Sequence, residues 1–221
     1  MELNMKTPDH ETLVVLIHGF CRGAVDMQFW KKTLEQDFAH IITPDLPTRY
    51  GSFEQCLEVL ADNIAAAHPE RFKQLCFAGH SMGGLMAREY LQRNRHAYAH
   101  TKRLVCVGTP HYGSKLADIA LLMPFAGRIW KPLHALKCSA RKTVTTPEID
   151  GLEIGAIIST NNGHWPGKLF LSKESDGLVE RFSAHAPDAK HIAYTNAAHI
   201  PMQFDAATAE LIRSFLLHGT F

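Results

Sequence analysis

The stretch Gly-His-Ser-Met-Gly-Gly at residues 79–84 constrains the fold of this chain more than any other part of the sequence. The run before it, residues 75–78, is short and apolar, which is typical of a buried strand. Residues 85–91 after it carry apolar side chains at helical spacing. Three glycines remove the Cβ atoms that would collide in a sharp turn. The pattern predicts a strand, a tight turn and a helix, with Ser81 held out at the top of a sheet beside a helix N-terminus that favours negative charge.

Five other apolar runs complete the pattern of a parallel sheet. Residues 12–17 are almost continuously apolar, as in strands that are buried on both faces. Residues 52–67 begin with Ser52 and Gln55 at the spacing of a capping box, which predicts the start of a helix. Strands alternate with helices, so residues 1–221 are expected to form one doubly wound α/β domain. The other expected strands are 41–43, 104–107, 155–159 and 190–194, and the other expected helices are 27–38, 82–93 and 203–218.

The composition is that of an ordinary globular chain. Its 221 residues suffice for one well-packed domain, and a net charge of +1 gives no reason to expect nucleic acid as a partner. No apolar stretch approaches 18 residues, so we expect no stable membrane insertion. Residues 1–8 lack the apolar core of a signal peptide, and the five cysteines lack C-x-x-C spacing, which favours a cytoplasmic location. The scattered His and Cys residues predict no metal and no cofactor.

The serine turn and four further motifs resemble the α/β-hydrolase family, in its lipase and esterase branch. The further motifs are residues 18–20, 108–114, 175–179 and 198–199. The resemblance implies an α/β-hydrolase fold, a compact and mostly parallel sheet of about six strands with helices on both faces and a small cap insert. It also implies a catalytic triad in the chain order serine, acid, histidine.

A serine hydroxyl becomes a nucleophile only when a base lies within hydrogen-bond reach and an acid orients that base. Among the histidines after Ser81, only His199 lies just beyond the last expected strand, and it is the predicted base. His191 lies inside that strand, and His185 precedes it and would emerge at the opposite edge of the sheet. The other two alternatives, His111 and His164, are expected to line the pocket.

Asp176 is the predicted acid. It lies in the sequence Ser-Asp-Gly-Leu-Val, where Gly177 permits a turn, and 23 residues before His199 leave room for a helix and the final strand. Asp150 and Asp188 are weaker alternatives because each precedes a strand and so lies at the wrong edge of the sheet. Two others are also weaker: Asp205 follows the histidine in the chain, and Glu174 is a near neighbour of Asp176.

The resemblance also assigns an oxyanion hole. In the family, the backbone N–H of the residue after His-Gly helps to bind the oxyanion, and here that residue is Phe20; Met82, which follows Ser81, supplies the second N–H. The alternative for residues 18–20 is a plain turn between strand and helix. Ligands bind at the C-terminal ends of parallel strands. The side chains expected to contact substrate there are His18, His80, His111 and Tyr112.

Residues 115–153 depart from the alternating pattern. Apolar side chains crowd into residues 116–130 nearly all round, and Pro124 and Gly127 break any helix there. This predicts a small cap that packs over the site. The alternative is the ordinary helix between two strands, with its apolar face on the sheet.

These features predict a serine hydrolase that cleaves carboxylic esters through an acyl-enzyme, with a small acyl ester as its partner. A thioesterase, an acyltransferase or an amidase could use the same triad, because fold alone does not choose among them. Outside enzymes, the alternative is a non-catalytic ligand-binding protein on the same scaffold. The complete set of Ser81, Asp176 and His199 argues against it, and labelling by a fluorophosphonate separates the two.

Overall fold

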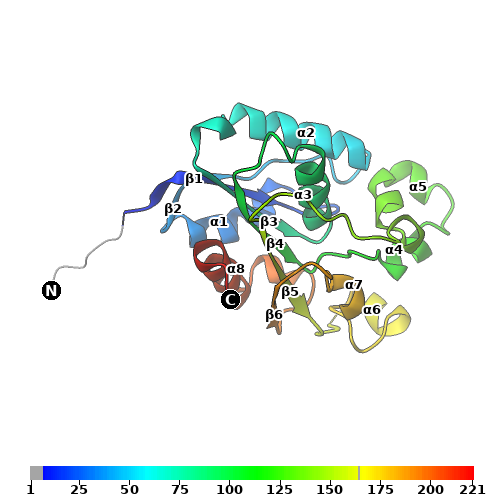
Figure 1. Ribbon diagram of the computed structural model, residues 1–221. Helices are drawn as coiled ribbons and strands as arrows, with labels where there is room; N and C mark the ends of the chain where they lie inside the picture. Colours follow the sequence, from blue (N-terminus) through cyan, green and yellow to red (C-terminus); the bar gives the residue numbers. More distant parts are fainter. Residues whose placement is uncertain (1–6, 164) are drawn as a thin grey trace.

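One parallel sheet forms the centre of the molecule (Figure 1). The computed structural model describes residues 7–163 and 165–221, and within them the sheet has six strands in the order β2-β1-β3-β4-β5-β6. Every neighbouring pair is parallel, so the expected α/β-hydrolase fold is confirmed with an entirely parallel sheet. The strands are β1 (Asp9–Ile17), β2 (Phe38–Ile42), β3 (Gln74–His80), β4 (Thr101–Val107), β5 (Glu153–Ser159) and β6 (His191–Thr195).

Helices cover both faces of the sheet and enclose two apolar cores. Successive side chains of a strand point to opposite faces, so an unbroken apolar strand can serve both. Leu13 and Val15 of β1 accordingly lie in one core, and Val14 and Leu16 lie in the other. The first core is completed by α2 (Phe53–Ala66) and α3 (Met82–Arg93), and the second by α1 (Gln28–Leu34) and α8 (Ala206–His218) (Figure 1).

Capping residues set where two helices begin. Ser52 Oγ accepts a hydrogen bond from the Gln55 N–H at 3.1 Å, and Gln55 Oε1 accepts one from the Ser52 N–H at 2.8 Å, so the predicted capping box is confirmed. The predicted closing helix began too early. Asp205 caps α8 by accepting from the Thr208 N–H at 2.8 Å, and the residues before it form a separate 3-10 turn, η5 (Pro201–Gln203).

The helix predicted around residues 27–38 begins within one residue of the prediction but ends four residues earlier. The chain first forms a 3-10 turn, η1 (Ala24–Met27), and α1 then ends at Leu34. The Asp37 N–H donates to the Leu34 carbonyl at 3.0 Å, which turns the chain out of the helix. Phe38 is buried and already pairs with β1 as the first residue of β2.

Short helices fill the connections at one end of the molecule, away from the N-terminus (Figure 1). No single long helix joins β4 to β5 in the described chain; residues 115–136, called the cap segment from here on, hold three short ones. No helix in the described ranges combines the length and apolar character that a membrane span requires. The short elements of these connections are α4 (Lys115–Ala120), α5 (Ala126–Ile129), η3 (Lys131–Leu136), η4 (Cys138–Ala140), α6 (Trp165–Phe170) and α7 (Arg181–Ala184). A further 3-10 turn, η2 (Pro69–Arg71), precedes β3 near the start of β1.

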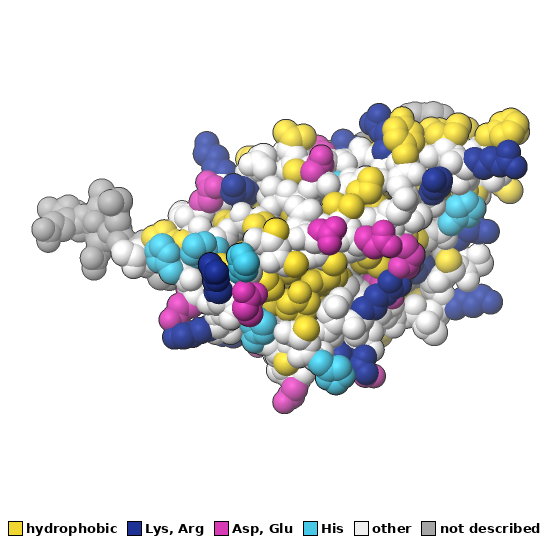
Figure 2. All heavy atoms as spheres, turned by 90° about the horizontal axis from the view of Figure 1, so that it is seen from above, with side chains coloured by type: hydrophobic (Ala, Val, Ile, Leu, Met, Phe, Trp, Pro, Cys, Tyr) yellow, Lys and Arg dark blue, Asp and Glu magenta, His cyan; other side chains and the backbone are white. Residues whose placement is uncertain are grey.

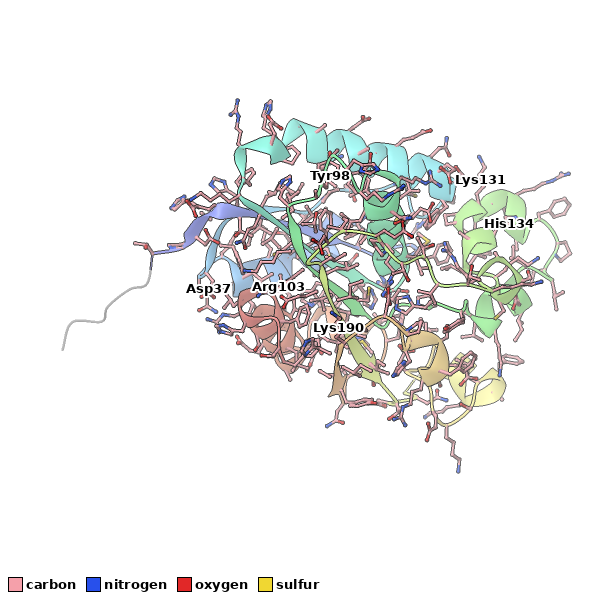
Figure 3. The ribbon with its side chains drawn as sticks, in the orientation of Figure 1. Asp37, Tyr98, Arg103, Lys131, His134 and Lys190 are labelled. Carbon is pink, nitrogen blue, oxygen red and sulfur yellow. The ribbon has the colours of Figure 1, made fainter. Side chains whose placement is uncertain are left out.

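Two arginines fasten α8, the helix that follows the predicted base, to the rest of the fold. Arg103 of β4 donates to Glu153 at 2.7 Å and to the Leu216 carbonyl of α8 at 2.8 Å. Arg213 of α8 donates to both carboxylate oxygens of Asp37, at 2.5 and 3.1 Å. Figure 3 shows Arg103 and Asp37 beside α8. These contacts fix the chain on the C-terminal side of His199.

Arg88 of α3 carries a buried charge. Its side chain is 1% exposed, and its terminal nitrogens donate to both carboxylate oxygens of Asp188 at 2.8 Å and to the Thr145 carbonyl at 2.9 Å. Burial opposes ionisation of Asp188, but hydrogen bonding and the charge of Arg88 outweigh it and hold the pKa of Asp188 below its ordinary value. The pair joins α3 to the loop that leads into β6.

Replacement of Asp188 by alanine should destabilise the fold strongly. It would leave the Arg88 charge buried without its partner, which typically costs about 3–5 kcal/mol. We expect a lower midpoint of urea unfolding with an unchanged slope. Asp150 is exposed in a turn, so Asp150→Ala is the control and should change the free energy of unfolding by less than about 0.5 kcal/mol. Equal effects of the two variants would contradict the role given to the ion pair.

Candidate active site

Ser81 sits in the turn between β3 and α3 with a backbone conformation that side chains rarely adopt. Its φ is 54° and its ψ is −122°. A positive φ in a residue other than glycine marks strain, and such strain concentrates at functional sites. The Ser81 N–H donates to the Val107 carbonyl of β4 at 2.8 Å, which holds the turn against the neighbouring strand.

Glycines make this turn sterically possible. A Cβ on Gly79 would collide with the backbone of Gly83 and Gly84. A Cβ on Gly83 would collide with the carbonyl oxygen of Ile17 in β1. The turn and the adjacent strand approach so closely that only a residue without a side chain fits. The steric reason inferred from the Gly-His-Ser-Met-Gly-Gly pattern is therefore confirmed.

Asp176 and His199 form a buried pair. His199 Nδ1 lies 2.6 Å from Asp176 Oδ2, and the His199 N–H donates to the Asp176 carbonyl at 2.9 Å. The other carboxylate oxygen accepts from the N–H groups of Leu178 at 3.0 Å and Val179 at 2.7 Å. The carboxylate is thus oriented by its own loop. With Nδ1 donating to the carboxylate, His199 Nε2 is left as the proton acceptor.

Gly108, directly after β4, makes room for this pair. Its φ is 55°, and a Cβ built on it would lie 3.2 Å from both Asp176 Oδ2 and His199 Nδ1. A side chain at this position would press on the hydrogen bond between the acid and the histidine. The backbone at the end of β4 therefore packs directly against the Asp176–His199 pair.

Each alternative acid has a different place in the structure. None of them contacts His199 in the described chain, because each is engaged elsewhere or faces solvent. Asp188 pairs with Arg88, Glu174 pairs with Arg181 at 3.1 Å, Asp205 caps α8, and Asp150 is exposed.

The alternative histidines are also placed elsewhere in the structure. His191 lies in β6 and packs against Phe215 of α8, with 5.8 Å between ring centres. His185 follows α7 and lines a second pocket. His164 lies outside the described residues. Among the histidines considered as bases, the described structure pairs only His199 with a carboxylate through a buried contact.

His80 and Gln203 hold the backbone at His199. His80 Nε2 donates to the His199 carbonyl at 2.9 Å, and its Nδ1 accepts from Gln203 Nε2 at 2.7 Å. Burial, reinforced by the nearby His199, holds the pKa of His80 well below its ordinary value, so the ring is neutral, as one donor and one acceptor require. No motif in the sequence predicts this role of Gln203; its only signal is its position four residues after His199.

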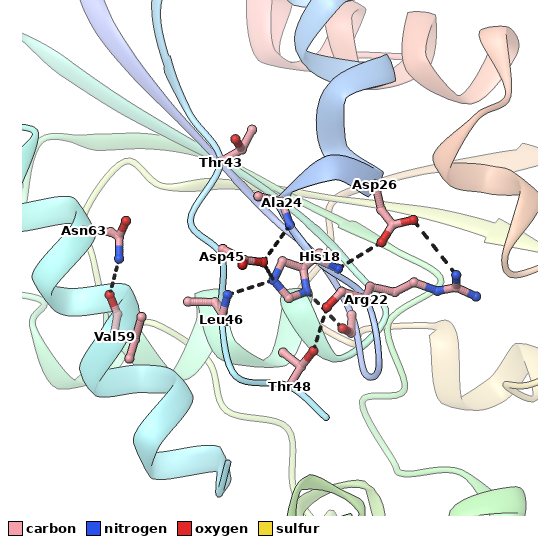
Figure 4. Close-up of polar contacts among 12 residues, drawn as sticks. His18, Arg22, Ala24, Asp26, Thr43, Asp45, Leu46, Thr48, Val59 and Asn63 are labelled. Carbon is pink, nitrogen blue, oxygen red and sulfur yellow. Dashed lines mark hydrogen bonds and ion pairs between the residues drawn. The ribbon is translucent and has the colours of Figure 1, made fainter. Parts of the chain in front are cut away.

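His18 serves the loop after β1 (Figure 4). Its Nε2 accepts from the Leu46 N–H at 2.9 Å, and its Nδ1 donates to the Gly19 carbonyl at 3.1 Å. Burial lowers the pKa of His18, which keeps the ring neutral. The side chain is fully buried and does not line the pocket that holds Ser81. His18 therefore positions Gly19 and Phe20.

His111 and Tyr112 also lie away from that pocket. The backbone N–H of His111 donates to the Ser183 carbonyl at 2.8 Å, and that of Tyr112 donates to Ser183 Oγ at 3.1 Å, so both residues are tied to α7. His111 is buried, which holds its pKa well below the ordinary value, and Tyr112 lines the second pocket. Of the four side chains expected to contact substrate, the structure brings His80 to the pocket.

Ser81 and His199 line one pocket of about 270 Å³. Its wall is largely apolar, and much of it belongs to the cap segment. No hydrogen bond joins the Ser81 hydroxyl to His199 in the described chain; contacts of this kind often tighten only when substrate binds. The apolar side chains of the wall include Leu116, Ala117 and Ala120 of α4, Leu133 and Leu136 of η3, and Leu178, Val179 and Ile200 opposite them.

Two backbone N–H groups are available on the serine side of this pocket. Met82 is the first residue of α3, so its N–H has no carbonyl one turn earlier to bind. Phe20 lines the pocket, and no described residue accepts a hydrogen bond from its N–H. A Cβ on Gly19 would lie 3.0 Å from Ser81 Cβ, so the loop after β1 runs against the serine. The arrangement can bind a negatively charged oxygen.

Comparisons with known proteins place this geometry in context. The sequence model described as "Alpha/beta hydrolase family" matches residues 14–203. No curated protein is a match. The mature form of the Bacillus licheniformis lipase BlEst2 has a similar structure, with a TM-score of 0.73, 18% identity, and coverage of 96% of this chain and 93% of the lipase.

Two further solved structures are similar. The metagenomic carboxyl esterase MGS0156 has a TM-score of 0.71 and 18% identity over 97% of this chain and 77% of the esterase. The RedJ thioesterase from the prodiginine pathway of Streptomyces coelicolor has a TM-score of 0.61 and 14% identity, with coverage of 96% of this chain and 88% of the thioesterase. Identities this low establish a shared fold, whereas the family match spans the sheet and the residues around Ser81, Asp176 and His199. The chain belongs to the α/β-hydrolase family.

Proposed function

We propose that this protein hydrolyses carboxylic esters, with Ser81 as nucleophile, His199 as base and Asp176 as the acid that orients it. The observation that carries the proposal is the 2.6 Å contact between His199 Nδ1 and Asp176. It leaves Nε2 as the acceptor in a pocket that Ser81 also lines. A strained serine, a correctly oriented imidazole and an apolar pocket together fit acyl transfer through a serine.

The reaction would proceed in two halves. His199 takes the Ser81 proton as the hydroxyl attacks the ester carbonyl, and the N–H groups of Phe20 and Met82 hold the resulting oxyanion. His199 then protonates the leaving alcohol. Water attacks the acyl-enzyme by the same route and releases the acid. Both oxyanion donors are backbone groups, so no side-chain substitution deletes them directly.

Apolar acyl groups fit the pocket best, because the cap segment contributes mostly aliphatic side chains to its wall. We infer that this segment, which forms the first part of the expected insert at about 115–153, acts as the cap of the single domain. A thioester is the second candidate substrate, and the similar structure of a protein described as a thioesterase favours it over an amide. Acyl transfer to an acceptor other than water would need the same triad.

No cofactor takes part in this mechanism, which uses side chains, backbone N–H groups and water. In residues 7–163 and 165–221, no cluster of three metal-ligating side chains is present. We propose a cytoplasmic location, supported by five free cysteines, three of them buried.

Ser81→Ala should abolish ester hydrolysis and leave the fold intact. Alanine meets no greater backbone strain than serine at a positive φ, and only one hydroxyl is lost. We expect kcat to fall at least about 10³-fold, with the thermal midpoint unchanged. A fluorophosphonate probe should label the wild-type chain at Ser81 and leave the variant unlabelled. Labelling of both chains alike would rule out Ser81 as the nucleophile.

Asp176→Asn should lower kcat on the order of 10³–10⁴-fold, the size of the effect in a serine protease. Asparagine keeps the shape and still accepts from the loop N–H groups, but its amide can donate to Nδ1 and so favours the wrong tautomer of His199. Ester hydrolysis and thermal melting would be measured side by side. Asp150→Asn is the control and should keep full activity; equal losses in both variants would refute the assignment.

The size of the pocket predicts short acyl chains. Its volume of about 270 Å³ lies just below the usual range for pockets that enclose drug-sized ligands, which is roughly 300–1,000 Å³. Among p-nitrophenyl esters from acetyl to palmitoyl, kcat/KM should be highest for short chains. Ala120→Leu, which fills the wall, should shift the optimum to still shorter chains. An optimum at palmitoyl that Ala120→Leu leaves unmoved would contradict this use of the pocket.

A further inference from the structure

The outer face of the cap segment is unusually apolar for a surface. Leu122 is 83% exposed, Phe125 is 68% exposed and Met123 is 54% exposed. Phe125 has a φ of 65°, so its backbone conformation is strained. Single exposed apolar residues need no explanation, but a contiguous group marks an interaction site. We name as the cap surface the exposed residues Ile119, Leu122, Met123, Phe125 and Ile129, with Leu169 and Phe170 of the neighbouring α6.

Cations without partners lie in the same stretch of the chain as this surface. Residues 115–142 hold six Lys or Arg and one Asp, although the whole chain has a net charge of only +1. Two of the six are engaged: Lys115 pairs with Glu180, and Arg141 donates to the Ala135 carbonyl. In the described chain the others form no ion pair. The four are Arg128, Lys131, Lys137 and Lys142.

The pictures show the two kinds of side chain together. Figure 2 shows yellow apolar side chains gathered with dark blue cations at the end of the molecule opposite the N-terminus. Figure 3 shows Lys131 and His134 on the cap at that same end. The apolar and the cationic side chains therefore lie at the same end of the molecule.

We propose that the cap surface docks on an anionic lipid surface. Apolar side chains beside unpaired Lys and Arg match a bilayer whose headgroups are negative and whose interior is apolar. A second copy of this chain fits worse, because a symmetric interface would bring this patch, with its excess of positive charge, against the same patch of the other copy. A lipid surface is fluid, so binding to it does not require a shape that matches the cap surface. The exposed aliphatic and aromatic side chains need only enter the apolar part of the bilayer.

The surface also has a position that suits this partner. On α4, Leu116, Ala117 and Ala120 line the pocket, whereas Ile119 is exposed on the outer face and Leu122 follows directly. Docking would bring the pocket wall next to the lipid. The benefit of this closeness for catalysis rests on the proposed function, but the docking itself requires no hydrolysis.

Co-sedimentation of the full chain with vesicles tests the proposal. The Ser81→Ala protein is mixed with vesicles of phosphatidylcholine, with and without phosphatidylglycerol, so that hydrolysis plays no part. We expect binding to the anionic vesicles that weakens with added salt. Leu122→Asn with Phe125→Asn should abolish it, and Arg128→Gln with Lys131→Gln should weaken it roughly 10- to 30-fold.

Matched variants elsewhere on the surface serve as controls. Lys32→Gln on α1 removes an exposed cation, and Phe204→Asn removes a side chain that is 50% exposed, both outside the cap surface. Neither should change vesicle binding. In a wild-type background, the cap variants should keep the melting temperature and the turnover of a soluble short ester, so a failure of docking is distinct from a failure of the proposed activity.

Three outcomes would overturn the proposal. The first is no binding to either vesicle, and the second is equal loss of binding in the control variants. The third is a concentration-dependent dimer in analytical ultracentrifugation that Leu122→Asn with Phe125→Asn abolishes, which would make a second copy the occupant of the cap surface.

Discussion

The close approach of β1 to the turn after β3 is the constraint on which the rest of this site depends. Gly83 lies so near the Ile17 carbonyl that no side chain fits between them. This contact fixes the start of α3 and the strained backbone of Ser81, and it brings the loop at Gly19 against the serine. At the end of β4, Gly108 leaves room for the side chains of Asp176 and His199, which a Cβ there would approach to 3.2 Å. The ends of three neighbouring strands thus lie against the three residues of the site.

Buried neutral histidines make the second contribution. The rings of His80 and His199 are 4.8 Å apart, so a protonated His80 would oppose the imidazolium that His199 must form in the proposed reaction. Burial, reinforced by the nearby His199, lowers the pKa of His80 and keeps the ring neutral. Because Nδ1 accepts from Gln203, Nε2 carries the proton and donates to the His199 carbonyl. His18 acts similarly on the loop that carries Phe20. The fold uses these rings as uncharged hydrogen-bonding links.

Local sequence signals were enough to predict the sheet and the serine turn, and the chain order implied by the family resemblance led to the contact between Asp176 and His199. Apolar runs, glycines and chain order are all visible without knowledge of distant partners. The roles of His18, His111 and Tyr112 depended on such partners: Leu46 binds the first, and Ser183 binds the backbone of the other two. The spacing of these residues in the sequence does not show which distant group each of them binds. The contact of Gln203 with His80 could not be predicted for the same reason.

The cap segment shows how one short element can carry two different faces. A six-residue helix such as α4 is not stable alone, and contacts at its N-terminal end help to hold it. Ser114 Oγ donates to the Leu178 carbonyl at 2.9 Å, and Lys115 pairs with Glu180 at 3.1 Å. These contacts tie α4 to the loop that also carries Asp176. The wall of the pocket and the cap surface are therefore attached to the same support as the acid, and a change on the outer face can leave the inner face in place.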